Sequence, residues 1–268
     1  MKGIIGAICG DIIGSTREFH PIKTKEFELI PKYSRFTDDT VLTIAIASWI
    51  LKDEQLRHGT LINEIRHICN SYPRLGYGGR FNHWLNSNNP GAYNSWGNGS
   101  AMRVSPVGWI ADNLEQTQLI AKRAAEVTHN AREGIKGAVT TASCIYLART
   151  GRSKEFIKEY IEDIFHYDLS RSLDEIRPNY SFEVSCQKSV PESIICFLEA
   201  DNYEDAVRNA ISLGGDADTQ AAIAGSIAAA YYDVPEEIYK ECLEILDLPL
   251  FEIFNEFNRR FYKWIKKQ

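Results

Sequence analysis

Apolar residues recur along this chain at the three- and four-residue spacing of helices, and no segment alternates strictly as a β-strand would. In 60–69, for example, Leu61, Ile65 and Ile68 share one helical face. Residues 39–51 are apolar on nearly every side, which predicts a helix buried all round. Altogether we predict helices over 39–51, 60–69, 111–127, 132–147, 155–165, 189–199, 203–213, 219–232, 235–246 and 250–266.

Two segments lack this periodicity. Residues 72–99 are rich in glycine and asparagine, which predicts a long functional loop or a pair of short helices joined by loops. Residues 168–184 are also irregular. Because the chain shows no repeat, no low-complexity tract and no obvious linker, we interpret residues 1–268 as a single all-α domain of orthogonally packed helices.

The composition is ordinary for a globular protein and excludes few functions. The chain has 268 residues, of which 44% are hydrophobic and 25% are charged, enough for a substantial core. Its net charge of -6 argues against electrostatic wrapping of nucleic acid, which needs a basic face. A small anionic ligand held at helix ends remains compatible with this charge.

The cysteines and the apolar stretches predict the cellular setting. Six cysteines lie mostly among apolar neighbours without CxxC or metal-binding spacing, so we expect buried free thiols in a reducing cytoplasm. Asp11 interrupts the apolar N-terminal run, and no signal-peptide cleavage pattern follows. The apolar stretch 221–232 is shorter than the ~20 residues of a membrane span. We therefore expect a cytoplasmic protein without a membrane partner.

The candidate chemistry lies in two acidic clusters, each at the start of a predicted apolar helix. The first is 36–40 (FTDDT) and the second is 214–219 (GGDADT). One acidic residue at a helix start is routine, because it caps free amide groups and interacts favourably with the helix dipole. Capping alone does not explain paired aspartates, since their mutual repulsion must be offset and neither cluster contains a lysine or arginine.

Divalent cations would supply the missing positive charge. Carboxylate and hydroxyl oxygens are the ligands that Mg²⁺ and Mn²⁺ prefer, and Thr37 and Thr219 add neutral oxygens to the two clusters. Two such clusters can hold two ions side by side. The prediction therefore requires folding to bring the residues near 38 and those near 217 together.

Two further segments are weaker signals. Residues 96–103 (WGNGSAMR) combine glycines with a predicted helix start, an arrangement that can point backbone amides at a phosphate but also serves a plain turn. His129 lies at the break between two predicted helices, where a capping role is more common than a catalytic one. The other histidines have no zinc-binding spacing, and the chain has no P-loop, GxSxG elbow or Rossmann fingerprint.

Taken together, these motifs resemble the ADP-ribosylglycohydrolase family. The matching stretches occur in the order of that family and extend over nearly the whole chain: 6–14 with Glu18, 36–40, 97–103, 128–130 with 133–134, and 214–219. The resemblance implies an all-α fold around a binuclear Mg²⁺ or Mn²⁺ centre. It also implies a hydrolase that cleaves the glycosidic bond between ADP-ribose and an acceptor on a protein or small molecule, which reverses ADP-ribosylation.

The resemblance also implies roles for individual residues. Glu18 matches the catalytic or gating glutamate, and Asp11 is expected to play a structural part inside the first helix. The implied metal ligands are Thr37, Asp38, Asp39, Asp216, Asp218 and Thr219. The implied substrate-binding residues are Gly97, Asn98, Gly99, Ser100, Met102 and His129.

Some features leave alternatives open. Many relatives have histidine and proline where this chain has Ala131 and Arg132, and 168–184 matches no assignable segment, so the acceptor is not predicted. The same acids would suit a two-metal phosphoesterase acting on a nucleotide. A non-catalytic ADP-ribose-binding protein and a metal-free glycosidase with two carboxylates are further alternatives.

Overall fold

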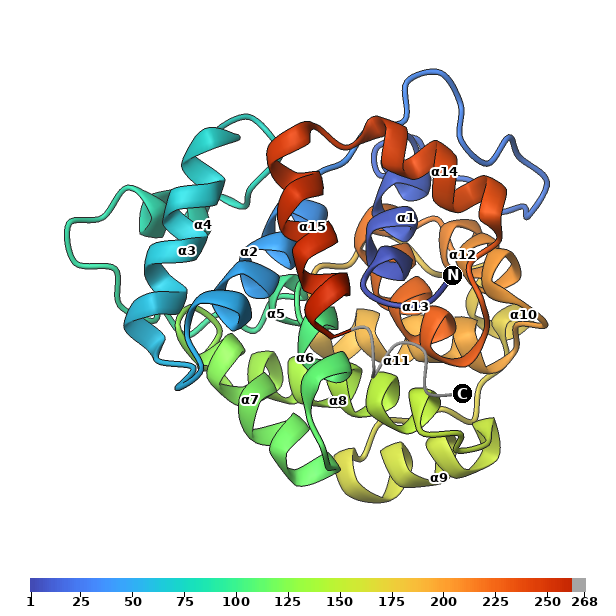
Figure 1. Cartoon of the computed structure of the whole chain (residues 1–268). Coiled ribbons are helices and arrows are strands. Elements are labelled where there is room, and N and C mark those ends of the chain that lie inside the picture. Colours follow the sequence, from blue (N-terminus) through green and yellow to red (C-terminus); the bar gives the residue numbers. More distant parts are fainter. Residues whose placement is uncertain (262–268) are drawn as a thin grey trace.

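The computed structural model describes residues 1–261, and every regular element in them is a helix (Figure 1). The predicted all-α fold is thereby confirmed; the nearest approach to a strand is one isolated bridge between Gly97 and Ser185. The helices are α1 (Ile5–Gly14), α2 (Asp38–Lys52), α3 (His58–Ser71), α4 (Gly79–Leu85), α5 (Gly99–Met102), α6 (Ser105–Ile110), α7 (Leu114–Glu126), α8 (Arg132–Arg149), α9 (Lys154–Phe165), α10 (Leu173–Ile176), α11 (Cys186–Leu198), α12 (Tyr203–Ser212), α13 (Ala217–Tyr231), α14 (Glu236–Ile245) and α15 (Leu248–Arg260).

The longer helices lie close to the predicted ranges, and the differences have local causes. The predicted 111–127 helix begins later, because the Asn113 side chain accepts a bond from the Gln116 amide and caps α7. The 72–99 segment contains the short helix α4, and 168–184 is irregular apart from α10. The predicted 250–266 helix corresponds to α15, which ends at Arg260, and positions 262–266 of the prediction lie outside the described residues.

The centre of the molecule is the close pair α1 and α13, which lie side by side although they come from opposite ends of the chain (Figure 1). Every residue of α1 is buried, as is nearly every residue of α13. The glycines of α1 make this approach possible, because a Cβ added at Gly10 would lie 2.1 Å from the carbonyl oxygen of Ala221. The approach brings the end of α1 against the start of α13.

This packing makes a stability prediction. Gly10→Ala is expected to lower the free energy of unfolding by about 3 kcal/mol, because the new methyl group meets backbone that cannot move independently. Gly59→Ala is the matched control, since Gly59 lies in α3 with nothing within 4 Å of an added Cβ. The control is expected to be neutral or stabilised by up to about 1 kcal/mol. Urea unfolding of both variants tests this, and equal stability would contradict the close approach.

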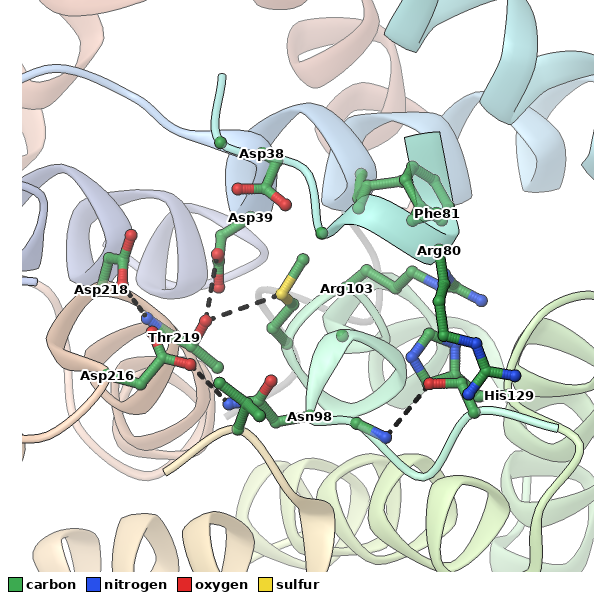
Figure 2. A pocket seen from close by; sticks show the side chains of 18 of the residues that line it. Asp38, Asp39, Arg80, Phe81, Asn98, Arg103, His129, Asp216, Asp218 and Thr219 are labelled. Carbon is green, nitrogen blue, oxygen red and sulfur yellow. Dashed lines mark hydrogen bonds between the residues drawn. The ribbon is translucent and has the colours of Figure 1, made fainter. Parts of the chain in front are cut away.

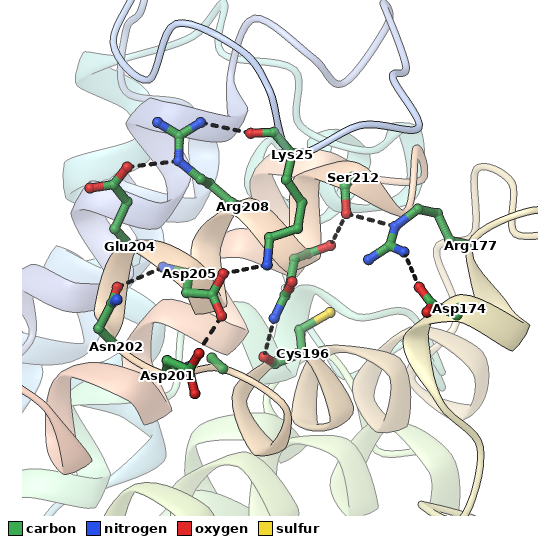
Figure 3. Close-up of polar contacts among 12 residues, drawn as sticks. Lys25, Asp174, Arg177, Cys196, Asp201, Asn202, Glu204, Asp205, Arg208 and Ser212 are labelled. Carbon is green, nitrogen blue, oxygen red and sulfur yellow. Dashed lines mark hydrogen bonds and ion pairs between the residues drawn. The ribbon is translucent and has the colours of Figure 1, made fainter.

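The loop 15–37, which carries Glu18, is bound to α12 through residues near its middle (Figure 3). The Arg208 guanidinium donates to the carbonyls of Lys25 and Phe27, both at 2.9 Å, and stacks 4.8 Å from the Phe27 ring centre. Lys25 forms an ion pair with Asp205. Nearer the site, the Lys23 ammonium donates to the carbonyls of Tyr180 and Leu213, which ties the loop to the turn before α13.

The structure also bears on the predicted state of the cysteines and on whether a helix could span a membrane. All six cysteines are buried and free, as predicted. Among residues 1–261, no helix is both long enough and apolar enough to cross a membrane.

Candidate functional site

The two acidic clusters meet at the start of α2 and α13, as the metal-site hypothesis requires (Figure 2). The Thr219 hydroxyl donates to Asp39 Oδ2 at 3.2 Å and so joins them directly. Carboxylate oxygens form two groups, each with its atoms within 4.8 Å of one another: Asp11, Asp39 and Asp218, and Glu18, Asp216 and Asp218. Asp218 belongs to both groups.

Local backbone structure places these acids. Thr37 is the N-cap of α2, where its hydroxyl accepts a bond from the Asp39 amide at 3.3 Å. Gly214 has φ +66°, a conformation that glycine adopts without strain, and it turns the chain into α13 just before Asp216. Gly14 at the end of α1 permits contact with the Asp218 backbone, because a Cβ there would lie 2.5 Å from the Asp218 Cα.

Asp11 lies inside α1, as expected, and its carboxylate organises the first turn of α2. It accepts bonds from the Thr37 amide at 2.9 Å, the Thr37 hydroxyl at 2.7 Å, and both the amide and the hydroxyl of Thr40. It also belongs to one of the two acidic groups, which its position in the sequence did not indicate. Asp11 therefore both supports the site and contributes to its negative charge.

The cluster has an unbalanced negative charge. Burial and then repulsion from neighbouring carboxylates raise the pKa of Asp38, Asp39 and Asp218 well above the ordinary value. Burial is also the main cause that raises the pKa of Asp216 to about 6 and that of Glu18 to about 7. No lysine or arginine in residues 1–261 forms an ion pair with any of these acids.

The donor set fits one or two divalent cations. Asp39 Oδ1 is buried without a hydrogen-bond partner among residues 1–261, so this carboxylate oxygen is left for a ligand that these residues do not supply. Oxygen donors of this kind, without nitrogen or sulfur, suit Mg²⁺ or Mn²⁺. The donor set therefore supports a site for divalent metal ions.

The predicted metal ligands occupy different places around the cluster. Asp39, Asp216 and Asp218 form its centre, whereas Asp38 lies in the cavity wall outside both groups of three. The Thr219 hydroxyl faces Asp39, and the Thr37 hydroxyl lies behind the cluster, 2.7 Å from Asp11. Because the Thr37 hydroxyl donates its proton to Asp11 and accepts one bond from the Asp39 amide, its oxygen keeps one lone pair for a metal ion.

The raised pKa values predict how the metal-free protein responds to pH. A carboxyl group whose pKa is higher in the folded state binds protons more tightly there, so its favourable contribution is lost as pH rises. With Asp216 and Glu18 raised to about 6 and about 7, the free energy of unfolding in chelator should fall between about pH 4 and pH 7. Added Mg²⁺ should oppose this fall, because metal binding requires ionised ligands. Thermal unfolding across this range, with and without Mg²⁺, measures both effects; a flat profile in chelator would contradict the prediction.

The acidic cluster forms one end of a cavity of about 440 Å³. The other end contains Arg80, Arg103 and His129, and Figure 2 shows these side chains on the side opposite Asp216 and Asp218. The cavity is therefore negative at one end and positive at the other. Its remaining lining includes Leu42, Gly76, Gly78, Gly79, Phe81, Tyr93, Ser95, Trp96, Phe182 and Val184.

Most of the predicted substrate-binding residues line this cavity. They are Gly97, Asn98, Gly99, Met102 and His129. The Asn98 amide also donates to Asp216 Oδ2 at 2.7 Å, which connects the glycine-rich loop to the acidic cluster. Ser100 differs, because it is buried and its hydroxyl donates to the Gly134 carbonyl at 2.7 Å. Its side chain joins α5 to α8.

Several lining residues were not predicted individually. Arg80 comes from the glycine-rich 72–99 segment, whose composition did indicate a functional loop. Phe182 and Val184 come from the irregular 168–184 segment, and both are partly exposed beside the cavity. Arg103 was visible in the 96–103 motif, but nothing in the sequence indicated that its charge would be buried.

Known proteins are similar to this chain over most of its length. Residues 1–266 match the family described as ADP-ribosylglycohydrolase. ADP-ribosylhydrolase ARH3 from Mus musculus is 26% identical over 338 residues, covering 94% of this chain and 91% of the relative. ADP-ribosylarginine hydrolase Tri1 from Pseudomonas putida is 25% identical, covering 86% and 70%. A solved structure titled "ADP-ribosylglycohydrolase-related protein complex" shares the fold, with a TM-score of 0.73 at 24% identity over 97% of this chain and 95% of that one.

Proposed function

Because this chain belongs to the ADP-ribosylglycohydrolase family, we propose that it is a metal-dependent hydrolase that releases ADP-ribose from an acceptor. The observation that supports this most strongly is the meeting of two carboxylate groups, which share Asp218, at one end of a cavity with cationic residues at the other. ADP-ribose has matching chemistry. Its terminal ribose offers hydroxyl groups to a metal-containing end, and its diphosphate is attracted to a positive end.

In this proposal Asp39, Asp216 and Asp218, with Thr37, Asp38 and Thr219 around them, would hold two Mg²⁺ or Mn²⁺ ions. When bound, such ions would provide Lewis acidity and bring the ribose hydroxyls and a water molecule together. The carboxylates would hold the ions in position, and the Asn98 side chain orients Asp216 by donating a hydrogen bond to its Oδ2. The glycine-rich loop and His129 would bind the diphosphate.

Glu18 is the proposed acid or base. It is half-buried next to Asp216 and Asp218 and lines the cavity, so its carboxyl oxygen can reach a bound substrate from the metal side. In the metal-free protein its pKa of about 7 lets the carboxyl group both hold and release a proton near neutral pH. It would take a proton from the attacking water or give one to the departing acceptor, as carboxyl groups do in glycoside hydrolysis.

The proposal is tested by product identity. The protein is incubated with ADP-ribosylated arginine, ADP-ribosylated serine, an ADP-ribosylated nucleic acid and O-acetyl-ADP-ribose, each with Mg²⁺, with Mn²⁺ and with chelator. Release of ADP-ribose that depends on metal supports the proposal and identifies the acceptor. AMP or free phosphate would indicate a phosphoesterase, binding without any product a non-catalytic binder, and undiminished activity in chelator a metal-free glycosidase.

A further inference from the structure

Arg103 is a buried cation without an acidic partner. Its side chain is 1% exposed, and no carboxylate within residues 1–261 forms an ion pair with it. Its Nη2 donates to the Ala124 carbonyl at 2.9 Å and to Thr128 Oγ1 at 2.8 Å, both near the end of α7. Burial lowers its pKa to about 10, so the guanidinium stays charged at neutral pH. Burying a charge without an ion-pair partner lowers the stability of the fold, so we expect Arg103 to have a role other than packing.

Thr128 connects Arg103 to His129. Thr128 Oγ1 lies 2.7 Å from His129 Nδ1 and already accepts the bond from Arg103. The hydroxyl has a single proton, Thr128 is fully buried, and no other acceptor for that proton is found in residues 1–261. The hydroxyl therefore donates to Nδ1, which must be unprotonated to accept.

This arrangement fixes the tautomer of His129. With Nδ1 as an acceptor, the proton of the neutral ring is on Nε2. Nε2 lies beside the glycine-rich loop, because a Cβ added at Gly99 would be 3.3 Å from it and one at Gly97 would be 3.7 Å away. The ring is thus a single N–H donor directed towards the loop that lines the cavity.

We propose that Arg103 and Thr128 are positioning residues that hold His129 as a neutral Nε2–H donor for a phosphate oxygen of the bound nucleotide. The identity of this ligand rests on the proposed function, whereas the tautomer does not. Thr128 acts through His129, and Arg103, which also lines the cavity, acts on His129 through Thr128. Nε2 is therefore the ring nitrogen of His129 that binds the ligand, because Nδ1 is occupied by the Thr128 hydroxyl.

The surroundings keep this donor constant over pH. The charged or titratable groups that face His129 are Arg103, Arg80 and Tyr93, whose ring centre lies 6.1 Å from the imidazole. Burial, followed by the charges of Arg103 and Arg80, lowers the pKa of His129 well below its ordinary value. The imidazole should therefore stay neutral across the working range, and the Nε2–H bond should not be lost as pH changes.

The first test reads the tautomer in the ligand-free protein. In ¹⁵N-labelled full-length protein, ring-nitrogen shifts of His129 should show Nε2 protonated and Nδ1 unprotonated from the ordinary histidine pKa of about 6.5 up to about pH 9. A proton on Nδ1, an equal mixture of tautomers, or titration within this range would overturn the proposal. This reading does not depend on activity, so it stands even if the proposed hydrolysis is wrong.

The second test compares Thr128→Val with Thr128→Ser. Valine removes the hydroxyl at nearly the same volume, whereas serine keeps it. We expect valine to mix the tautomers and weaken ADP-ribose binding, measured by calorimetry, by about tenfold, the effect of losing one hydrogen bond. Serine should retain the wild-type tautomer and affinity. Equal behaviour of the two variants, at any thermal stability, would show that Thr128 has only a packing role; absence of ADP-ribose binding in the wild type would overturn the proposed function instead.

The third test asks whether Arg103 acts on His129. Arg103→Gln removes the positive charge and, because the glutamine side chain is too short to reach Thr128 Oγ1, the hydrogen bond as well. His129 should titrate at a higher pH than in the wild type, and its tautomers should mix as in Thr128→Val. An unchanged His129 titration would remove Arg103 from the proposal, and if this variant does not fold, the Thr128 pair still decides the tautomer.

Discussion

Asp218→Asn is expected to abolish the metal-dependent release of ADP-ribose, with a loss of at least about 100-fold. Even residues that only orient metal ligands cost 10- to 100-fold when they are replaced, and Asp218 belongs to both carboxylate groups. Asparagine has nearly the same shape and can still accept the 2.9 Å bond from the Thr219 amide. The loss should therefore reflect the missing charge and not a distorted helix start. Turnover measured at saturating Mg²⁺ and Mn²⁺ checks this.

The same variant should separate a metal ligand from a helix cap by its stability. Without metal, Asp218→Asn should leave the melting temperature unchanged or raise it, because it removes one charge from a repulsive, buried cluster. With Mg²⁺, the wild type should gain stability by mass action and the variant should not. An equal loss of stability with and without metal would favour capping alone.

Asp53→Asn is the matched control for this experiment. Asp53 is also a buried aspartate at a helix end, but its carboxylate is paired with Arg57 at 2.9 Å. Its replacement should lower stability to the same extent with and without metal and leave turnover intact. A control that behaved like Asp218→Asn would mean that the metal effect is not specific to the cluster.

The parts of the structure that could be predicted are those encoded by local pattern. Apolar residues at helical spacing identified most of the long helices, whereas the first helix, α1, was expected only from the family resemblance. The short helices α6 and α10 were missed because four to six residues carry too little periodicity. The late start of α7 was readable in principle, since Asn113 is a good capping residue. The acidic clusters were found because adjacent buried carboxylates need a partner that the sequence nearby does not provide.

The rest of the site depends on contacts between distant residues. Asp11 joins the acidic group only because α1 packs tightly against α13 through its glycines. Arginines are usually exposed, so the sequence gives no reason to expect that Arg103 is buried and bonded to Thr128, next to His129. Phe182 and Val184 line the cavity from a segment without regular structure, where no periodicity indicates which side chains turn inwards. Such positions are set by tertiary packing.

Glu18→Gln is expected to eliminate turnover while leaving binding intact. General acid–base catalysis contributes about 10²- to 10⁴-fold, and glutamine keeps the size and polarity of the side chain but cannot exchange a proton. Glu18 is half-buried at the cavity edge, on the loop that Lys23 ties to the turn before α13. The variant should therefore bind ADP-ribose as the wild type does and retain the Mg²⁺-dependent rise in melting temperature.

Three measurements on the same preparation separate the possible roles of Glu18: turnover, the dissociation constant for ADP-ribose, and the melting temperature with and without Mg²⁺. Glu26→Gln, on the exposed part of the same loop, is the matched control and should change none of them. If Glu18→Gln lost turnover and the Mg²⁺-dependent stabilisation together, Glu18 would be a metal ligand, as its place beside Asp216 and Asp218 also permits. If turnover were unchanged, the proton would have to be transferred by another group. Asp38, which lines the cavity and lies outside both groups of three, would be the next candidate.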